Sequence, residues 1–509
     1  MGKESDMPAA AKRLEWRVNM PDGTSRVLVS SSSRGRWKVW DIVWGFVVRI
    51  WSFIDKAWQL GKKEPRKVIH GLKVGLALSL VSLFYYLRPL YDDVGGNAMW
   101  AVMTVVVVFE YTVGATLSKC VNRTLATFLA GSLGVGVHWI ANQSGQKFQP
   151  IILQASVFLL AAAATFSRFI PSIKARFDYG CTIFILTFSL VSVSGYRVDK
   201  LLDLAQQRLS TIALGTSICI FIAMLLCPVW AGDDLHRLIT NNLEKLADSL
   251  EGCISEYLNA DGDDDDKDDK GSDKKLVAYK CVLNTKASED SMANFAVWEP
   301  GHGRFNFRHP WKQYLKIGAS MRACAYCIET LHGSINSSTQ VRSAEYILEP
   351  VSEECRRVCS TSAKVLRDLA KLMKSTTKSS IQDILVHDMN SAVEALQLAF
   401  KTLPSQSLTT TQVEAHQKPS PDHMKQETKS SSDDHDLVHL MEIAQLSTVA
   451  SLVVEIAARI EGVVKEVNHL ANLAGFRAQS NKKMAKQSQT QHKEQNVQIK
   501  PTNKDCTQL

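Results

Sequence analysis

The 509-residue sequence lacks the motifs by which many enzymes are recognised. It contains neither a glycine-rich phosphate loop of the Walker type nor the Gly-x-Ser-x-Gly turn that presents a nucleophilic serine. Its eleven cysteines show neither the paired spacing nor the density of a secreted disulfide scaffold, so we interpret them as reduced thiols. The sequence therefore predicts no enzyme, no catalytic residue and no cofactor.

Two stretches resemble metal sites only superficially. Cys324-x-x-Cys327 is followed by Cys355-x-x-x-Cys359, but both pairs lie in segments with helical periodicity, whereas structural zinc sites prefer short pairs borne on turns. The acidic run 261–275 lacks the spaced acids and terminal glutamate of an EF-hand loop. We expect core cysteines, a solvated acidic loop and no metal.

Apolar residues are concentrated in one third of the chain. Hydrophobic segments occur near 68–87, 98–113, 125–141, 151–169, 179–193 and 210–229. Most approach the roughly 20 residues that a helix needs to cross a bilayer. The first thirty residues lack the apolar core of a signal peptide, so the first span would act as the insertion signal. We predict an all-α membrane protein with six transmembrane helices, followed by a cytosolic helical bundle domain.

The positive charges between the predicted spans indicate the orientation. Lys and Arg crowd the segment before the first span, and Arg168, Lys174 and Arg176 fill the connection between the fourth and fifth spans. The positive-inside rule then places both termini in the cytosol. The plasma membrane and the vacuolar membrane both remain open, because no sorting signal decides between them.

The flanking regions complete the expected domain organisation. In the N-terminal arm, 1–66, one helical stripe carries Trp37, Trp40, Trp44, Trp51 and Trp58. We interpret this stripe as an amphipathic helix at the cytosolic membrane surface, or alternatively as a helix packed on the cytosolic domain. The pore domain spans 67–230, and the cytosolic helical domain spans 231–478 with the acidic loop 261–275 and a disordered linker over 404–436. A polar, disordered tail is expected over 479–509.

Ionisable residues in the apolar third are the most informative chemical feature. Lys119 and Arg123 lie four residues apart on one helix face, Arg208 falls in the first turns of the sixth span, and Lys73 falls in the first. A charge in hydrocarbon costs several kcal/mol unless it faces water, a partner or a pore. Fixed cations suit an anion pathway because they replace the hydration that an anion loses. The alternative is that Arg123 and Lys73 pair with Glu110 or extend to the surface.

Acidic residues are scarce within the predicted spans. Three acidic residues lie instead at the predicted outer mouth of the pore, namely Asp92, Asp199 and Asp203.

A polar, aromatic stretch at 298–314, WEPGHGRFNFRHPWKQY, invites interpretation as a metal or nucleic-acid site. Its two histidines, His302 and His309, are seven residues apart across a loop, and the sequence has no wider basic face of the kind that binds nucleic acid. We therefore expect a structural clasp, in which aromatic side chains hold a tight loop against the bundle. These are Trp298, Phe305, Phe307 and Trp311. The basic residues of the loop would then be free to face the inner mouth and attract anions.

Five strings of the sequence closely resemble the plant aluminium-activated malate transporter family. They are NAMWAVMTVVVVFEYTVGATLSKCVNRTLATFLAGSLG, RFDYGCTIFILTFSLVSVSGYR, QQRLSTI, CPVWAGDDLH and WEPGHGRFNFRHPWKQYLKIG. The resemblance extends over 65–333 and more loosely to 478. It implies a homodimeric channel with six spans per subunit that passes malate and other organic or inorganic anions.

The resemblance also implies roles for individual residues. The family's basic pore positions match Arg123 in VNRTLAT and Arg208 in QQRLSTI. Acidic positions that respond to aluminium in some members match Asp92, Asp199 and Asp203, but many members lack that response. The expected partners are anions and membrane lipid, with no nucleic acid. Two other functions stay open: a coupled carrier or exporter of organic acids, and a membrane-anchored scaffold.

Overall fold

The computed structural model describes residues 16–19, 25–28, 34–86, 98–195, 201–259, 277–337, 345–378, 381–414 and 430–478. The chain divides into two compact units, 1–72 and 73–509. The first unit contains an antiparallel hairpin of β1 (Trp16–Asn19) and β2 (Ser25–Leu28), in which Trp16 pairs with Leu28. The all-α prediction missed this hairpin because four-residue strands are too short to show a clear alternation.

The tryptophan-rich segment forms the long helix α1 (Arg34–Lys63). Trp44, Trp51 and Trp58 recur every seven residues, and their exposed fractions are 68%, 68% and 65%. The side chains of Trp37 and Trp40 lie outside the described residues. The exposed stripe agrees with an amphipathic helix, and its placement on a membrane surface stays a prediction.

The apolar third forms six helices. They are α2 (Pro65–Tyr86), α4 (Ala98–Val108), α5 (Val113–Gln143), α6 (Gln149–Ser167), α7 (Pro171–Gly195) and α8 (Leu201–Leu225). By length and hydropathy, α5, α6, α7 and α8 are able to cross a membrane. Helix α4 has only 11 residues, which rise about 16 Å and reach about halfway through the hydrocarbon. The expected second span is therefore shorter than predicted.

A side-chain cap sets the start of α5. Thr112 has an extended backbone, and its hydroxyl accepts a hydrogen bond of 3.3 Å from the amide of Ala115. Such a cap satisfies one of the amide groups that a helix leaves without a partner at its amino end. Helix α5 thus begins at Val113, so Lys119 and Arg123 both lie inside it.

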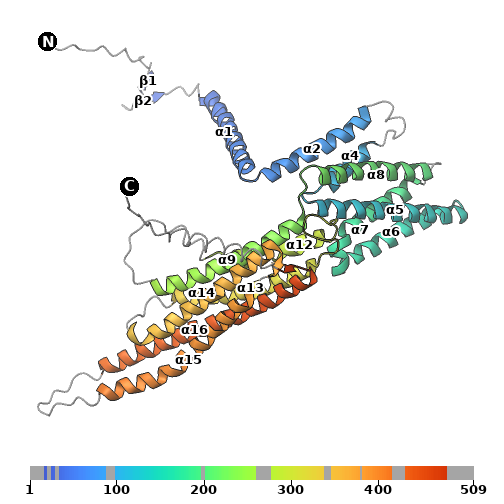
Figure 1. The fold of residues 1–509 in the computed structure, drawn as a ribbon. Helices are drawn as coiled ribbons and strands as arrows, with labels where there is room; N and C mark the ends of the chain where they lie inside the picture. The colour runs from blue at the N-terminus through green and yellow to red at the C-terminus, as the bar shows by residue number, and fades with distance from the viewer. Residues whose placement is uncertain are drawn as a thin grey trace, which may run out of the picture. The chain divides into compact units, whose positions relative to one another are not determined.

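The membrane helices pack through small residues. Helix α5 contacts α7 and α8, while α4 contacts α8 and α6 contacts α7 (Figure 1). A Cβ atom on Gly134 would lie 2.8 Å from Val191 of α7, so α5 and α7 approach closely at this glycine. Cβ atoms on Gly131 and Gly136 of the same helix would meet nothing within 4 Å, so the close approach is specific to Gly134 among these three glycines. Helix α6 exposes Phe158 and other large apolar side chains, as a lipid-facing helix does.

The rest of the second unit is a helical domain. Its helices are α9 (Ala231–Asn259), α11 (Tyr279–Leu283), α12 (Lys286–Ala296), α13 (Trp311–Ser337), α14 (Glu345–Ser375), α15 (Gln382–Glu414) and α16 (Ser430–Leu473). Helices α9, α13, α14, α15 and α16 run alongside one another around one apolar core (Figure 1). A short parallel pair joins β3 (Thr377–Lys378) to β4 (Arg477–Ala478).

The structure bears differently on the predicted core cysteines and on the predicted disordered linker. Cys324, Cys355 and Cys359 lie in the core of the helical domain, which confirms the prediction of core cysteines, and burial raises the pKa of Cys355 to about 12. Helices α15 and α16 extend into the predicted linker 404–436 from both ends. Residues 415–429, the acidic loop 261–275 and the tail 479–509 lie outside the described residues. The domain boundaries stay predictions.

Candidate functional site

Arg123 and Arg208 line the same small cavity among the membrane helices. Arg123 comes from α5 and Arg208 from α8, and the other lining residues include Trp100 of α4, Thr127 of α5 and Thr187 of α7. The cavity measures about 20 Å³, which is enough for one water molecule, since a water needs about 10–15 Å³. A dicarboxylate is several times larger and does not fit into this cavity.

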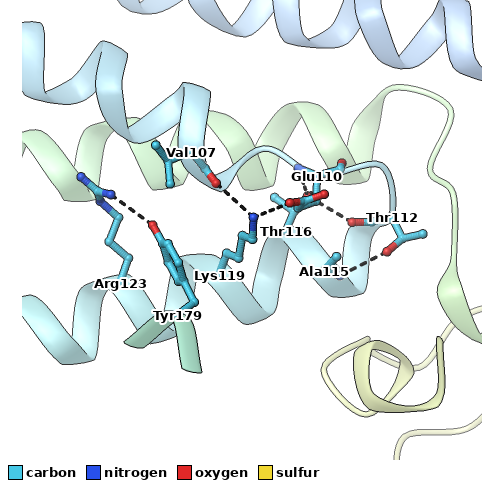
Figure 2. A network of polar contacts seen from close by, with 8 residues as sticks. All are labelled: Val107, Glu110, Thr112, Ala115, Thr116, Lys119, Arg123 and Tyr179. Carbon is cyan, nitrogen blue, oxygen red and sulfur yellow. Dashed lines mark hydrogen bonds and ion pairs between the residues drawn. The ribbon is translucent and has the colours of Figure 1, made fainter. Parts of the chain in front are cut away.

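Both guanidinium groups keep unused hydrogen-bonding capacity. Arg123 is 7% exposed, and its Nη1 donates to the Tyr179 hydroxyl at 3.1 Å (Figure 2). The guanidinium carbon of Arg208 lies 4.4 Å from the centre of the Trp100 ring, which is cation–π geometry. Within the described part of the chain, the Nε atoms of both arginines have no hydrogen-bond partner, and neither arginine forms an ion pair.

Thr127 adds to this polar lining. Its hydroxyl is buried in the same cavity and likewise has no partner among the described residues. Buried polar groups usually find partners, and those that do not call for a ligand, an ion or water. The cavity therefore combines two cations with unused hydrogen-bonding groups, which is an arrangement that can bind an anion.

Lys119 differs from Arg123 although the two share one face of α5. Its ammonium group donates to the carboxylate of Glu110 and lies 3.4 Å from the carbonyl oxygen of Val107 (Figure 2). The alternative pairing of Arg123 with Glu110 is therefore wrong, because Glu110 pairs with Lys119 instead. The turn between α4 and α5 brings Glu110 beside Lys119, one helical turn before Arg123.

Lys73 lies elsewhere. Its Nζ donates to the carbonyl oxygen of Cys227 at 2.8 Å, and the residue is 6% exposed. Cys227 follows the end of α8 and has a positive φ of 40°, so the lysine satisfies a carbonyl where the helix has stopped. Lys73 does not line the cavity of Arg123 and Arg208. It is held by a structural hydrogen bond, and its predicted place in the pore stays untested.

The side chains of the three acidic residues predicted at the outer mouth of the pore are not described by the structure. Asp92 and Asp199 fall outside the described residues, and Asp203 is described only by its helical backbone in α8. The role of these acids stays a prediction.

The loop before α13, which contains residues 298–310 of the polar, aromatic stretch, joins the membrane helices to the helical domain through Glu299. The Glu299 carboxylate accepts backbone hydrogen bonds from Gly114 at 3.2 Å, from Ala231 at 2.6 Å and from Gly232 at 3.1 Å. Its side chain is 1% exposed. Helices α5 and α9 both begin at these amides, where helix dipoles favour a negative charge. One acidic side chain therefore caps two helices at once.

Sequence reasoning missed Glu299 because an acid in a polar loop gives no sign of which distant helices it caps. The expected aromatic clasp is confirmed in part. Phe305 and Trp311 are buried, with 3% and 6% exposure, and Trp298 is half-buried. Phe307 is 70% exposed, so the prediction that it holds the loop against the bundle is wrong. Its ring projects away from the core that Phe305 enters.

The histidines of this region bond to a buried tyrosine or stack on a ring. His236 and His309 lie 2.9 and 3.2 Å from the hydroxyl of Tyr314, and burial lowers the pKa of each histidine to about 4. The ring of His302 stacks on Trp230 with 4.0 Å between centres. Over the described ranges, no three His, Cys, Asp or Glu side chains gather as a metal site would require. These histidines act as packing groups.

Comparison with known proteins gives a consistent result. Residues 58–439 match the family model described as aluminium activated malate transporter. The chain is 52% identical over 490 residues to aluminum-activated malate transporter 10 of Arabidopsis thaliana, covering 93% of this chain and 96% of that protein. It is 49% identical over 354 residues to aluminum-activated malate transporter 2 of the same plant, covering 70% of each chain. The wheat protein aluminum-activated malate transporter 1 (Triticum aestivum) is 40% identical over 435 residues, covering 84% of this chain and 86% of that protein.

Proposed function

Because the chain belongs to the aluminium-activated malate transporter family, we propose that it conducts malate across a membrane as an anion channel. The family consists of transporters, not enzymes, and the chain is an integral membrane protein with several apolar helices of membrane-spanning length. Other organic anions and inorganic anions are the further proposed substrates. Each would move down its own electrochemical gradient.

The observation that carries this proposal is the pair of guanidinium groups at one cavity. Arg123 and Arg208 reach the cavity from α5 and α8, and their Nε atoms have no partner among the described residues. An unpaired cation among membrane helices costs several kcal/mol unless water or an anion reaches it. Two such cations that face one cavity support an anion-binding step at this place, because their hydrogen-bond donors would replace the water molecules that the anion loses.

The small volume of this cavity supports the proposal that it is a constriction of the pore in its closed state. With about 20 Å³ of space, the site holds a water but not malate, so the described arrangement corresponds to a closed constriction. Trp100 is the bulky wall against which Arg208 packs. Opening then requires α4 and α8 to separate from α5 and α7, which widens the space between the two arginines.

The six-span arrangement belongs to the same proposal. Helices α2 and α4 would be the two further spans beside the four helices of membrane-spanning length. The positive-inside rule places both termini and the helical domain in the cytosol. We further propose a homodimer, in the plasma membrane or the vacuolar membrane, as the family resemblance implies.

Currents recorded from membrane patches test the channel mechanism. With unequal malate, nitrate or chloride on the two sides, the reversal potential should follow the equilibrium potential of the anion. A gradient of H⁺ or Na⁺ should leave it unchanged. A reversal potential set by a second ion would instead identify a coupled carrier. A scaffold would give no anion current although labelled protein is present at the membrane.

A further inference from the structure

A second, larger cavity lies where the amino end of α7 meets the loop before α13. It measures about 400 Å³, which is within the range of about 300–1,000 Å³ that small-molecule sites occupy. Arg176 of α7 forms one side, and residues from Ala296 to Lys312 form the rest. The cavity shares no lining residue with the constriction at Arg123 and Arg208. It is therefore a different cavity from that constriction.

The walls of this cavity are largely aromatic and apolar. Phe305 and Trp311 form its buried part, and the exposed ring of Phe307 stands at its edge. Pro300 and Pro310 add two further rigid apolar surfaces. Flat rings pack well against such faces. Phe307, which contributes nothing to the core, presents its large exposed ring beside this opening.

Positive charges surround the same opening. Arg176, Arg308 and Lys312 line it, and none of these three forms an ion pair with any described carboxylate. Arg308 is moreover a non-glycine residue with a positive φ of 70°. Strained backbones of this kind cluster at ligand sites.

The one carboxylate in the lining does not neutralise these cations. Glu299 accepts three backbone hydrogen bonds at the amino ends of α5 and α9, which engage its negative charge. His302 lies 3.9 Å from Glu299, on the inner side of the loop. The accessible charge of the cavity is thus positive, and its accessible surface is aromatic.

We propose that this cavity binds a small aromatic carboxylate, with the ring against Phe307 and Trp311 and the carboxylate against Arg308 and Lys312. The bound ligand would press on the loop that holds Glu299 and would thereby act on α5. This second step rests on the proposed function, because α5 carries Arg123. The binding step does not depend on any current.

Calorimetric titration of the full-length protein in lipid nanodiscs tests the binding step. The probe is 3-phenylpropionate, and the uncharged 3-phenylpropionamide serves as the matched ligand. The variant Arg308→Gln/Lys312→Gln removes two exposed charges without touching the core. Lys316→Gln, one helical turn further along α13 and outside the cavity, is the matched control.

The proposal predicts saturable binding of one 3-phenylpropionate per chain. Each exposed charge contributes up to about fivefold, so the double variant should bind about tenfold more weakly, while Lys316→Gln stays within about twofold. Phe307→Ala should also weaken binding, because it removes one ring contact. The absence of saturable binding overturns the site, as does equal affinity for the amide or equal weakening by Lys316→Gln.

A current measurement tests the second step separately. Applied to the side of the membrane that carries the helical domain, 3-phenylpropionate should change the malate current of the wild-type protein at least about twofold. Arg308→Gln/Lys312→Gln should lose most of this change. Binding without a change in current overturns the coupling to α5 and leaves the site intact. If no malate current exists at all, the proposed function fails, and the titration still decides the site.

Discussion

The side-chain carboxylate of Glu299 lies 3.2 Å from the amide nitrogen of Gly114, although 185 residues separate them in the sequence. This contact joins the loop of the helical domain to the first turn of α5, the helix that carries Arg123. The same carboxylate binds Ala231 and Gly232 at the start of α9. A displacement of this loop therefore reaches α5 directly.

The close contact at Gly114 predicts a strong effect of a single methyl group. A Cβ atom there would lie 2.4 Å from the carbonyl oxygen of Phe295 and 2.9 Å from Glu299 Oε1. Because a backbone atom cannot yield as a flexible side chain does, Gly114→Ala should force the loop away from α5. We expect a loss of about 1–3 kcal/mol in the free energy of unfolding, read as a lower melting temperature.

The matched control for Gly114→Ala lies in the same helix. A Cβ atom on Gly131 would meet nothing within 4 Å, so Gly131→Ala should be neutral or slightly stabilising through helix propensity. Equal melting temperatures for the two alanine variants would contradict the close contact between α5 and the loop.

Because Glu110 pairs with Lys119, we expect that removing the acid increases the attraction of Lys119 for anions. Glu110→Gln leaves the ammonium group of Lys119 without its carboxylate and exposes an uncompensated positive charge next to Tyr179. The half-saturating malate concentration of the current should fall about two- to fivefold. The double variant Glu110→Gln/Lys119→Gln should return to the wild-type value. An unchanged concentration in Glu110→Gln would place this pair away from the anion's route.

The histidines around Tyr314 predict a pH-dependent stability. In the folded chain the pKa of His236 and of His309 is about 4, below the ordinary value of 6.5, and burial is the main cause. Between these values the unfolded chain binds more protons than the folded chain, so the free energy of unfolding rises with pH. The contribution of each histidine to this free energy is complete above about pH 6.5. Lowering the pH from 7 to 5 should cost about 2 kcal/mol for each histidine.

Melting temperatures of the full-length protein at pH 5, 6 and 7 measure this effect. The variant His236→Gln/His309→Gln keeps polar partners for the Tyr314 hydroxyl and should show a flatter profile. Burial also raises the pKa of Glu299, whose ionisation works in the opposite direction, and the histidine variant separates the two contributions. A profile as steep as that of the wild type would show that these histidines do not titrate below their ordinary range.

Local patterns in the sequence were sufficient to predict much of the helical architecture. Long apolar runs and three- to four-residue spacing located most helices, and the cost of charge in hydrocarbon singled out Arg123 and Arg208. The same reasoning grouped Lys119 with Arg123, because spacing on one helix does not reveal Glu110 on the preceding turn. Glu299 escaped notice for a related reason, since its partners lie at the starts of two helices far away in the chain.

The most direct test of an anion pathway at the paired arginines is the malate current of Arg123→Gln and Arg208→Gln, normalised to the protein labelled at the membrane. Losing a charged donor to a desolvated anion costs about 1.5–3 kcal/mol, so each variant should carry about tenfold less current or lower. Arg237→Gln, an exposed arginine on α9, should stay within about twofold of the wild type. A wild-type current in Arg123→Gln/Arg208→Gln at equal membrane abundance would contradict the pathway.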